Sequence, residues 1–225
     1  MIIRSGLIKN RDSVDFGEFS KHWKDVHGPL ARIVPRMRAY SQNHIRRTLA
    51  SGEPFGFHRV DGISQLRFDS LADMAAAMES PEQHACIVDI QSFLSDATIL
   101  IQEEGKLNSC GHASPDGIEL MYLLRGDDAA LAQVLDGLSK LKSASGGSFR
   151  LNRIINRDFR VDPTVPAGDQ MIDGMLEVFL ADDVTCGRFK ETGAVEYSPG
   201  IDVIGAYEVS EYVVLPLQEE TKTRL

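Results

Sequence analysis

The chain has 225 residues, of which 43% are hydrophobic and 25% charged, as is usual for a folded globular protein. Its formal net charge of -9 argues against a general nucleic-acid binder, which needs a basic face. Three scattered cysteines without a CxxC pair do not make a disulfide framework or a zinc site. The N-terminal segment lacks the apolar core of a secretion signal, and no stretch approaches the length of a membrane span. We therefore expect a soluble, cytoplasmic protein that does not contact a membrane.

The first half of the sequence predicts a strand, a helix, two strands, a helix and a strand. Asp15 suits the N-cap of the first helix, and Glu18 completes a capping box. We expect this helix to break or kink just after His27, because Gly28-Pro29 disfavours helical geometry before the proline. This order of elements is that of a ferredoxin-like domain. The expected strands cover 2–8, 37–49, a segment ending at 68, and 97–102, and later helices begin at Ser70 and Ser80.

The second half predicts the same plan. Its expected strands cover 118–124, 149–156, 171–180 and 201–214, and its expected helices 127–141 and 182–192. Two segments, Tyr40-Ser-Gln-Asn43-His-Ile45 and Phe149-Arg-Leu-Asn152-Arg-Ile154, place an aromatic residue, Asn, a basic residue and Ile at equal offsets. The match favours a duplication. We expect two domains, residues 1–110 and 114–225, with their boundary in the turn-rich stretch 106–116.

The predicted sheets need a partner. A four-stranded antiparallel sheet with both helices on one face leaves its other face bare, and that face must be buried. Packing the two sheets against each other buries both bare faces and encloses an interior. The predicted fold class is therefore α+β, with two tandem ferredoxin-like (β-α-β-β-α-β) domains whose antiparallel sheets pack together as an α+β barrel. A small ligand is expected in that interior.

The first half also resembles a known family. It carries Phe19-x3-Trp23-x3-His27-Gly-Pro29-Leu30, then Tyr40-x-Gln42-Asn43, and later Asp61-Gly62-Ile63 and Ser80-Pro81-Glu82. These blocks are similar to the EthD family of the dimeric α+β barrel superfamily, over roughly residues 1–105. The second half resembles the family only in layout, because it has no His-Gly-Pro.

The resemblance implies a ferredoxin-like fold, barrel pairing and a site near His27. Relatives in the superfamily include cofactor-free lactone isomerases, polyketide cyclases and dehydratases, quinol-forming monooxygenases and haem-handling proteins. The resemblance therefore predicts the fold more closely than the reaction. It leaves open whether the chain forms a homodimer.

His27, Tyr40 and His44 are the candidate catalytic residues. His27 follows Trp23 by four, so it shares the apolar face of its helix, and imidazole exchanges a proton near neutral pH. The alternative is a structural histidine bonded to a backbone carbonyl. Tyr40 and His44 lie on the same side of a strand with Gln42 between them, where they could stabilise an enolate oxygen. The alternative for this side is contact with solvent.

Trp23, Gln42 and Arg46 are the candidate substrate-binding residues. Asn43 lies on the opposite side of its strand and recurs as Asn152, so we interpret it as structural. The run from Arg32 to Arg47 holds five arginines and no acid. This pattern is typical of a solvated face balanced by acids elsewhere in the fold. The alternatives are a site that attracts a small anionic substrate and a contact with RNA.

The predicted function is a cofactor-independent enzyme that acts on a small cyclic or oxo/carboxylated compound, as an isomerase, cyclase or dehydratase, by proton transfer through His27 in the barrel cavity. No metal is expected, because His22 and His27 are five apart and cannot share a helix face. Nucleotide-binding and serine-hydrolase motifs are absent from the sequence. Two alternatives stay open. One is a ligand-binding protein without turnover, and the other is a haem- or oxygen-using relative of the monooxygenase type.

Overall fold

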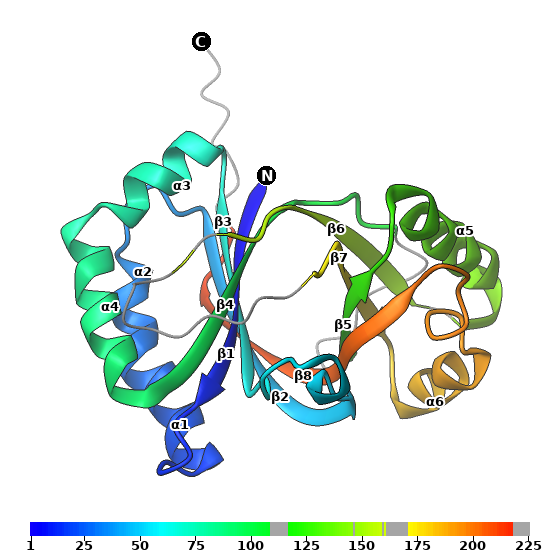
Figure 1. Cartoon of the computed structure of the whole chain (residues 1–225), viewed down its shortest axis with the longest axis horizontal. Coiled ribbons are helices and arrows are strands. Elements are labelled where there is room, and N and C mark those ends of the chain that lie inside the picture. Colours follow the sequence, from blue (N-terminus) through cyan, green and yellow to red (C-terminus); the bar gives the residue numbers. More distant parts are fainter. Residues whose placement is uncertain (109–116, 146, 159, 161–170, 218–225) are drawn as a thin grey trace.

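The strands close into one barrel. The computed structural model describes all residues except 109–116, 146, 159, 161–170 and 218–225. Within that part of the chain, eight antiparallel strands form a closed barrel in the order β1-β3-β2-β8-β5-β7-β6-β4 (Figure 1). The fold is therefore α+β, as predicted, and the boundary stretch with Cys110 and His112 lies mostly outside the described residues.

Each half of the chain supplies four neighbouring strands. The first half gives β1 (Ile2–Asn10), β2 (Ala39–Ala50), β3 (Gly62–Phe68) and β4 (Leu94–Glu103), in the spatial order β4-β1-β3-β2. The second half gives β5 (Ile118–Arg125), β6 (Ser148–Asn156), β7 (Gly174–Leu180) and β8 (Asp202–Leu215), in the order β8-β5-β7-β6. Pairing of β2 with β8 and of β4 with β6 joins the two sets.

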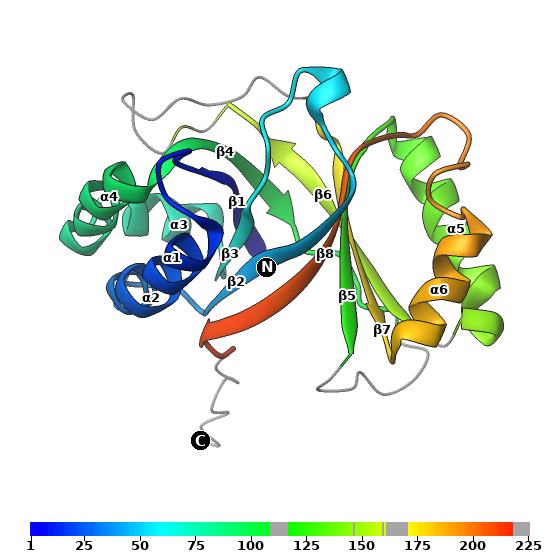
Figure 2. The same ribbon diagram turned by 90° about the horizontal axis from the view of Figure 1, so that it is seen from below.

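Helices cover the outside of the barrel on two opposite flanks (Figures 1 and 2). One flank carries α1 (Phe16–His22), α2 (Gly28–Arg32), α3 (Leu71–Met78) and α4 (Pro81–Phe93), and the other carries α5 (Asp128–Ser145) and α6 (Asp183–Thr192). The side chains of Asp15, Ser70 and Ser80 cap α1, α3 and α4 as expected, each accepting a hydrogen bond from a backbone N–H in the first turn. A single 3-10 turn, η2 (Glu53–Phe55), interrupts the loop after β2. No helix within the described ranges is long and apolar enough to cross a membrane.

The helix does not break after His27, although the sequence predicted a break there. The chain stays helical through Gly28, whose φ is -55° and ψ is -53°, and Pro29 lies in the first turn of α2. A π-helical turn, η1 (Trp23–His27), stands in place of the break. A proline inside a helix removes one donor and crowds the carbonyl four residues earlier. The wider π turn accommodates both effects, and such turns are frequent at functional sites.

Alternate residues of each strand point into the barrel and toward the helices, so the hydrophobic core is divided between these two sides of the sheet. The barrel interior holds an apolar core that includes Leu7, Ile45, Ile63 and Met175. Further clusters pack outside the barrel, beneath the helices of each flank. Both faces of the strands are therefore buried. This arrangement decides which space each candidate side chain reaches.

Candidate functional site

One carboxylate holds two histidines at the interface between helices. His27 Nδ1 lies 2.9 Å from Asp89 Oδ2, and His22 Nε2 lies 2.9 Å from Asp89 Oδ1. Burial raises the pKa of Asp89, but the hydrogen bonds from His27 and His22 outweigh it and keep that pKa below its usual value. Because Asp89 is ionised, its carboxylate accepts a hydrogen bond from the protonated Nδ1 of His27. The lone pair of a neutral His27 then resides on Nε2, as in other carboxylate-oriented imidazoles.

The His27 ring lines a small cavity between the first helix flank and the outer face of the sheet. This cavity, called here the His27 cavity, measures about 40 Å³, and its lining includes Arg4, Trp23, His27, Tyr40 and Phe93. At roughly 10–15 Å³ for each water, it has room for about three waters or for the reacting end of a ligand. Arg4 is buried, and burial lowers its pKa to about 10, so the guanidinium is charged at neutral pH.

The predicted location in the barrel interior is wrong. His27, Tyr40 and Trp23 contact the outer face of the strands, and the barrel wall separates them from the apolar core that contains Ile45 and Ile63. The alternation along β2 was assigned correctly, because Tyr40, Gln42 and His44 share one face. That face is turned toward the helices, because closing the barrel turns the other face inward.

Gln42 links the remaining candidates by hydrogen bonds. Its Nε2 donates to the Trp23 carbonyl at 2.7 Å and to the Tyr40 hydroxyl oxygen at 3.1 Å. Its Oε1 lies 3.3 Å from His44 Nε2, while Ser20 Oγ lies 2.8 Å from His44 Nδ1. Because the amide already donates from its nitrogen, Oε1 accepts from a protonated Nε2 of His44. Burial, and then the charge of Lys24, lower the pKa of His44 to about 4, so this ring is neutral at pH 7.

His44 and Arg46 face a different space from His27. They line an open groove of about 660 Å³ along α1, η1, β2 and β8. The structure thus brings His27, Tyr40 and Trp23 together at one cavity and sets His44 and Arg46 at another, with Gln42 between the two. The arginine run is also divided, because Arg36, Arg38 and Arg47 form ion pairs with Asp73, Asp69 and Glu208.

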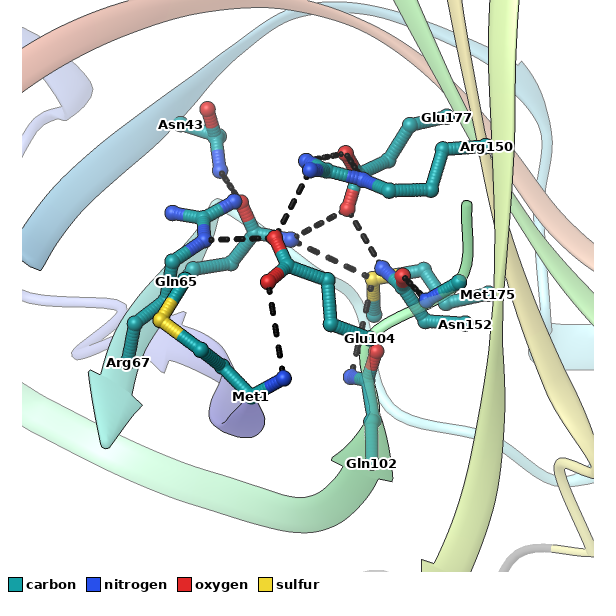
Figure 3. A network of polar contacts seen from close by, with 11 residues as sticks. Met1, Asn43, Gln65, Arg67, Gln102, Glu104, Arg150, Asn152, Met175 and Glu177 are labelled. Carbon is teal, nitrogen blue, oxygen red and sulfur yellow. Dashed lines mark hydrogen bonds and ion pairs between the residues drawn. The ribbon is translucent and has the colours of Figure 1, made fainter. Parts of the chain in front are cut away.

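The barrel interior contains a polar layer that the sequence analysis missed (Figure 3). Asn43 donates to Gln65 at 3.3 Å, and Gln65 donates to the buried carboxylate of Glu177 at 2.7 Å. Asn152 donates to the same carboxylate at 2.6 Å, and Arg150 forms an ion pair with it. Gln65 and Glu177 thus connect Asn43 to Asn152 across the barrel, and Asn152 also accepts a hydrogen bond from the Gly105 N–H in the loop after β4 at 3.0 Å. Arg67, Gln102, Glu104 and Met175 extend the network.

Asp89 and Arg4 are the functional candidates that sequence reasoning overlooked. Asp89 stands on α4 between Cys86 and Phe93, which are both buried. A carboxylate three residues after one core residue and four before another shares their helix face, and this was the available signal. Arg4 stands between apolar residues at the start of a buried strand, which was a weaker signal. Cys86 is a buried free thiol, and burial raises its pKa to about 11, as expected of a small core residue.

A haem does not fit at the His27 cavity. About 40 Å³ is far too little for a porphyrin, and the Phe93 ring centroid lies only 5.6 Å from that of the imidazole. His44 offers no alternative ligand, because both its ring nitrogens have hydrogen-bond partners. No step is therefore routed through a haem at this site.

Comparisons with known proteins agree with the sequence resemblance. Residues 11–97 match the family model described as EthD domain, so the first half of the chain carries an EthD domain. An EthD family protein from Bacillus halodurans C-125 is 25% identical, covering 46% of this chain and 98% of its own, with a TM-score of 0.38. No curated protein matches the chain.

Solved structures that match nearly the whole chain include the following two. An anthrone oxidase-like protein has a TM-score of 0.63 at 8% identity, covering 100% of this chain and 96% of its own. A proposed monooxygenase from Lactobacillus acidophilus NCFM has a TM-score of 0.56 at 7% identity, covering 95% of each chain. At such low identity the likeness concerns the fold.

Proposed function

We propose, on the premise that the first half of the chain carries an EthD domain, that the protein is an enzyme that moves a proton on a small cyclic or oxo/carboxylated compound without a cofactor. The reaction is of the isomerase, cyclase or dehydratase type. The observation that carries the proposal is the 2.9 Å bond between His27 Nδ1 and Asp89 Oδ2, with the imidazole lining a cavity. Proton transfer requires a base that is held in a fixed orientation beside a cavity in which the substrate can bind.

His27 acts as the base. Its Nε2 takes a proton from a carbon next to a carbonyl group, and the bonding electron pair moves to the carbonyl oxygen. Asp89 stabilises the imidazolium that forms. His27 then returns the proton to another carbon, or to a departing hydroxyl in a dehydration.

Arg4 and Tyr40 stabilise the developing negative charge. Arg4 contributes a cation to the lining of the His27 cavity. Tyr40 accepts from Gln42, so its own O–H is the group that can donate to an oxyanion. Burial raises the pKa of Tyr40 above its ordinary value, which keeps the phenol protonated. Arg4 also favours a substrate with a carboxylate.

A ring-sized substrate needs more space than the cavity offers. The π turn η1 carries both Trp23 and His27, so an outward shift of this turn would enlarge the cavity. We therefore assign η1 the role of the element that adjusts to substrate.

The two halves are proposed to be tandem ferredoxin-like domains, residues 1–110 and 114–225. The equal strand orders β4-β1-β3-β2 and β8-β5-β7-β6 support a duplication. Only the first domain has the His-Gly-Pro motif, so the proposed chemistry belongs to it.

Exchange of carbon-bound protons tests the proposal. A panel of lactones and β-keto acids is incubated with the protein in D₂O, and deuterium uptake is followed by NMR. His27→Ala should slow exchange at least about 100-fold, the scale of a lost general base. His84→Ala, which removes an exposed histidine of α4, is the matched control and should leave the rate unchanged.

Other outcomes decide against the proposal. Equal exchange in wild type and His27→Ala would end the role of His27. Saturable binding of a compound without any exchange would favour a binding protein. Consumption of dioxygen by the wild type with the same compounds would favour the monooxygenase-type alternative.

A further inference from the structure

The open groove beside the first helix has the dimensions of a small-molecule site. Its volume is about 660 Å³, within the range of roughly 300–1,000 Å³ typical of ligand pockets. Its lining includes Phe16, Ser20 and Lys24, which are spaced four residues apart, and His44, Arg46, Glu211 and Tyr212 from β2 and β8. This set is called the Lys24 groove. We propose that the Lys24 groove binds a small aromatic carboxylate, at a site separate from the His27 cavity.

The charge of the groove points to an anion. Among the residues that the structure describes, neither Lys24 nor Arg46 has a carboxylate within salt-bridge distance. By contrast, Arg36, Arg38 and Arg47 nearby are paired with acids. Two cations that share one hollow in a protein of net charge -9 create a local positive potential, which attracts an anionic ligand.

The walls of the groove point to an aromatic ring. Phe16 is 45% exposed and Tyr212 is 37% exposed, although both are large apolar side chains. The Lys24 ammonium lies 4.4 Å from the centroid of the Tyr212 ring, so this cation and this ring face the same space. A flat aromatic ligand can cover these exposed rings while its carboxylate reaches Lys24 or Arg46.

Within the described part of the chain, Glu211 is the one acidic residue in the lining of the groove. It pairs across the strands with Asn43, whose side chain faces the barrel interior, and directly paired residues project to the same face. Burial is the main cause that raises the pKa of Glu119, and the negative charges of Glu177 and Glu211 raise it further. The Glu211 side chain therefore projects to the face of β8 opposite Tyr212, and the two cations Lys24 and Arg46 outnumber this one acid among the residues that line the groove.

Ser20 adds a preference for a donor group on the ligand. The His44 ring is protonated on Nε2, so its Nδ1 accepts the hydroxyl proton of Ser20. The Ser20 oxygen then offers free lone pairs and accepts a hydrogen bond. A hydroxyl on the aromatic ring supplies that hydrogen bond.

Calorimetric titration with 2-naphthoate tests the site. The wild type should bind it, and the double variant Lys24→Gln/Arg46→Gln should bind it at least tenfold more weakly. Arg32→Gln, which removes one exposed cation from α2, is the control for loss of a positive charge outside the groove and should change the affinity less than twofold. The neutral isostere 2-naphthamide should bind wild type and double variant equally.

Two further measurements make the assignment specific. The probe 6-hydroxy-2-naphthoate should bind more tightly than 2-naphthoate, and Ser20→Ala should abolish that gain. In NMR titrations, 2-naphthoate should shift the ring signals of His44 and leave those of His27 in place.

The proposal fails under any of three results. These are the absence of 2-naphthoate binding to wild type, an equal loss of affinity in Arg32→Gln and the double variant, or shifts confined to His27. The last result would move the ligand to the His27 cavity, and it would leave the proposed proton transfer intact.

Discussion

His27 Nδ1 and Asp89 Oδ2 lie 2.9 Å apart although 62 residues separate them in the chain. The π turn η1 supplies the imidazole, and α4 supplies the carboxylate. Asp89 also bonds His22, so one side chain fixes the orientation of two rings. The pair defines which nitrogen of His27 can act as a base.

The first prediction concerns Asp89→Asn. The amide keeps the shape of the side chain but no longer stabilises the imidazolium or fixes the tautomer, so kcat for deuterium exchange should fall on the order of 10³-fold. KM should change little, because Asp89 does not line the cavity. His22→Gln is the control and should lower kcat less than about tenfold. A similar loss in both variants would assign Asp89 a merely structural role.

The second prediction concerns the pH dependence of stability. His44 is 9% exposed and its pKa is about 4 in the folded protein, against roughly 6.5 in an unfolded chain. Between these values only the unfolded state binds a proton, so stability is lost as the pH falls from 6.5 to 4. At pH 4.5 the loss should be about 2 kcal/mol for the wild type relative to His44→Gln. Urea unfolding at pH 7.0, 5.5 and 4.5 measures it, and parallel profiles would contradict the burial of a neutral ring.

The third prediction concerns the polar layer inside the barrel. Glu177 is 1% exposed and accepts hydrogen bonds from Gln65 and Asn152 while paired with Arg150. Glu177→Ala leaves the Arg150 charge without this partner, so the free energy of unfolding should fall by about 3–5 kcal/mol. Asp128→Asn, in an exposed ion pair with Arg153, should cost less than about 1 kcal/mol. Denaturant titrations of both variants give the comparison, and equal losses would argue against a buried ion pair.

The fourth prediction concerns the backbone next to Trp23. A Cβ added at Gly62 would clash with the Trp23 ring, whereas one added at Gly137 would meet nothing within 4 Å. Gly62→Ala should therefore destabilise the protein by about 1–3 kcal/mol and should displace the indole that lines the His27 cavity. Gly137→Ala, in the middle of α5, should stabilise it by about 0.5–1 kcal/mol. Thermal unfolding and indole fluorescence follow the two effects, and an unchanged indole spectrum in Gly62→Ala would contradict the close contact.

Local patterns in the sequence predicted the elements well. Asp15, Ser70 and Ser80 mark helix starts, because a capping side chain and its backbone donor are three residues apart. The π turn escaped prediction, because the residue before a proline can stay helical when the preceding turn widens, and that choice depends on packing against α4 and the sheet.

The candidate site was harder to place. Residues 39–45 of β2 are all buried, since one side packs beneath helices and the other fills the barrel. Alternation therefore separated Tyr40, Gln42 and His44 from Asn43 without revealing which side faces inward. A sheet with one solvated face would have resolved the choice by polarity, but a barrel covered by helices does not.

The sequence by itself determined the strand and helix order and the EthD character of the first half, and it singled out His27 as a candidate, because each depends on neighbours within a few residues. The tertiary structure alone decided that Asp89 orients His27, that His44 lines the Lys24 groove instead of the His27 cavity, and that Asn43 lies inside the barrel. These relationships join segments far apart in the chain, and barrel closure and helix packing set their geometry.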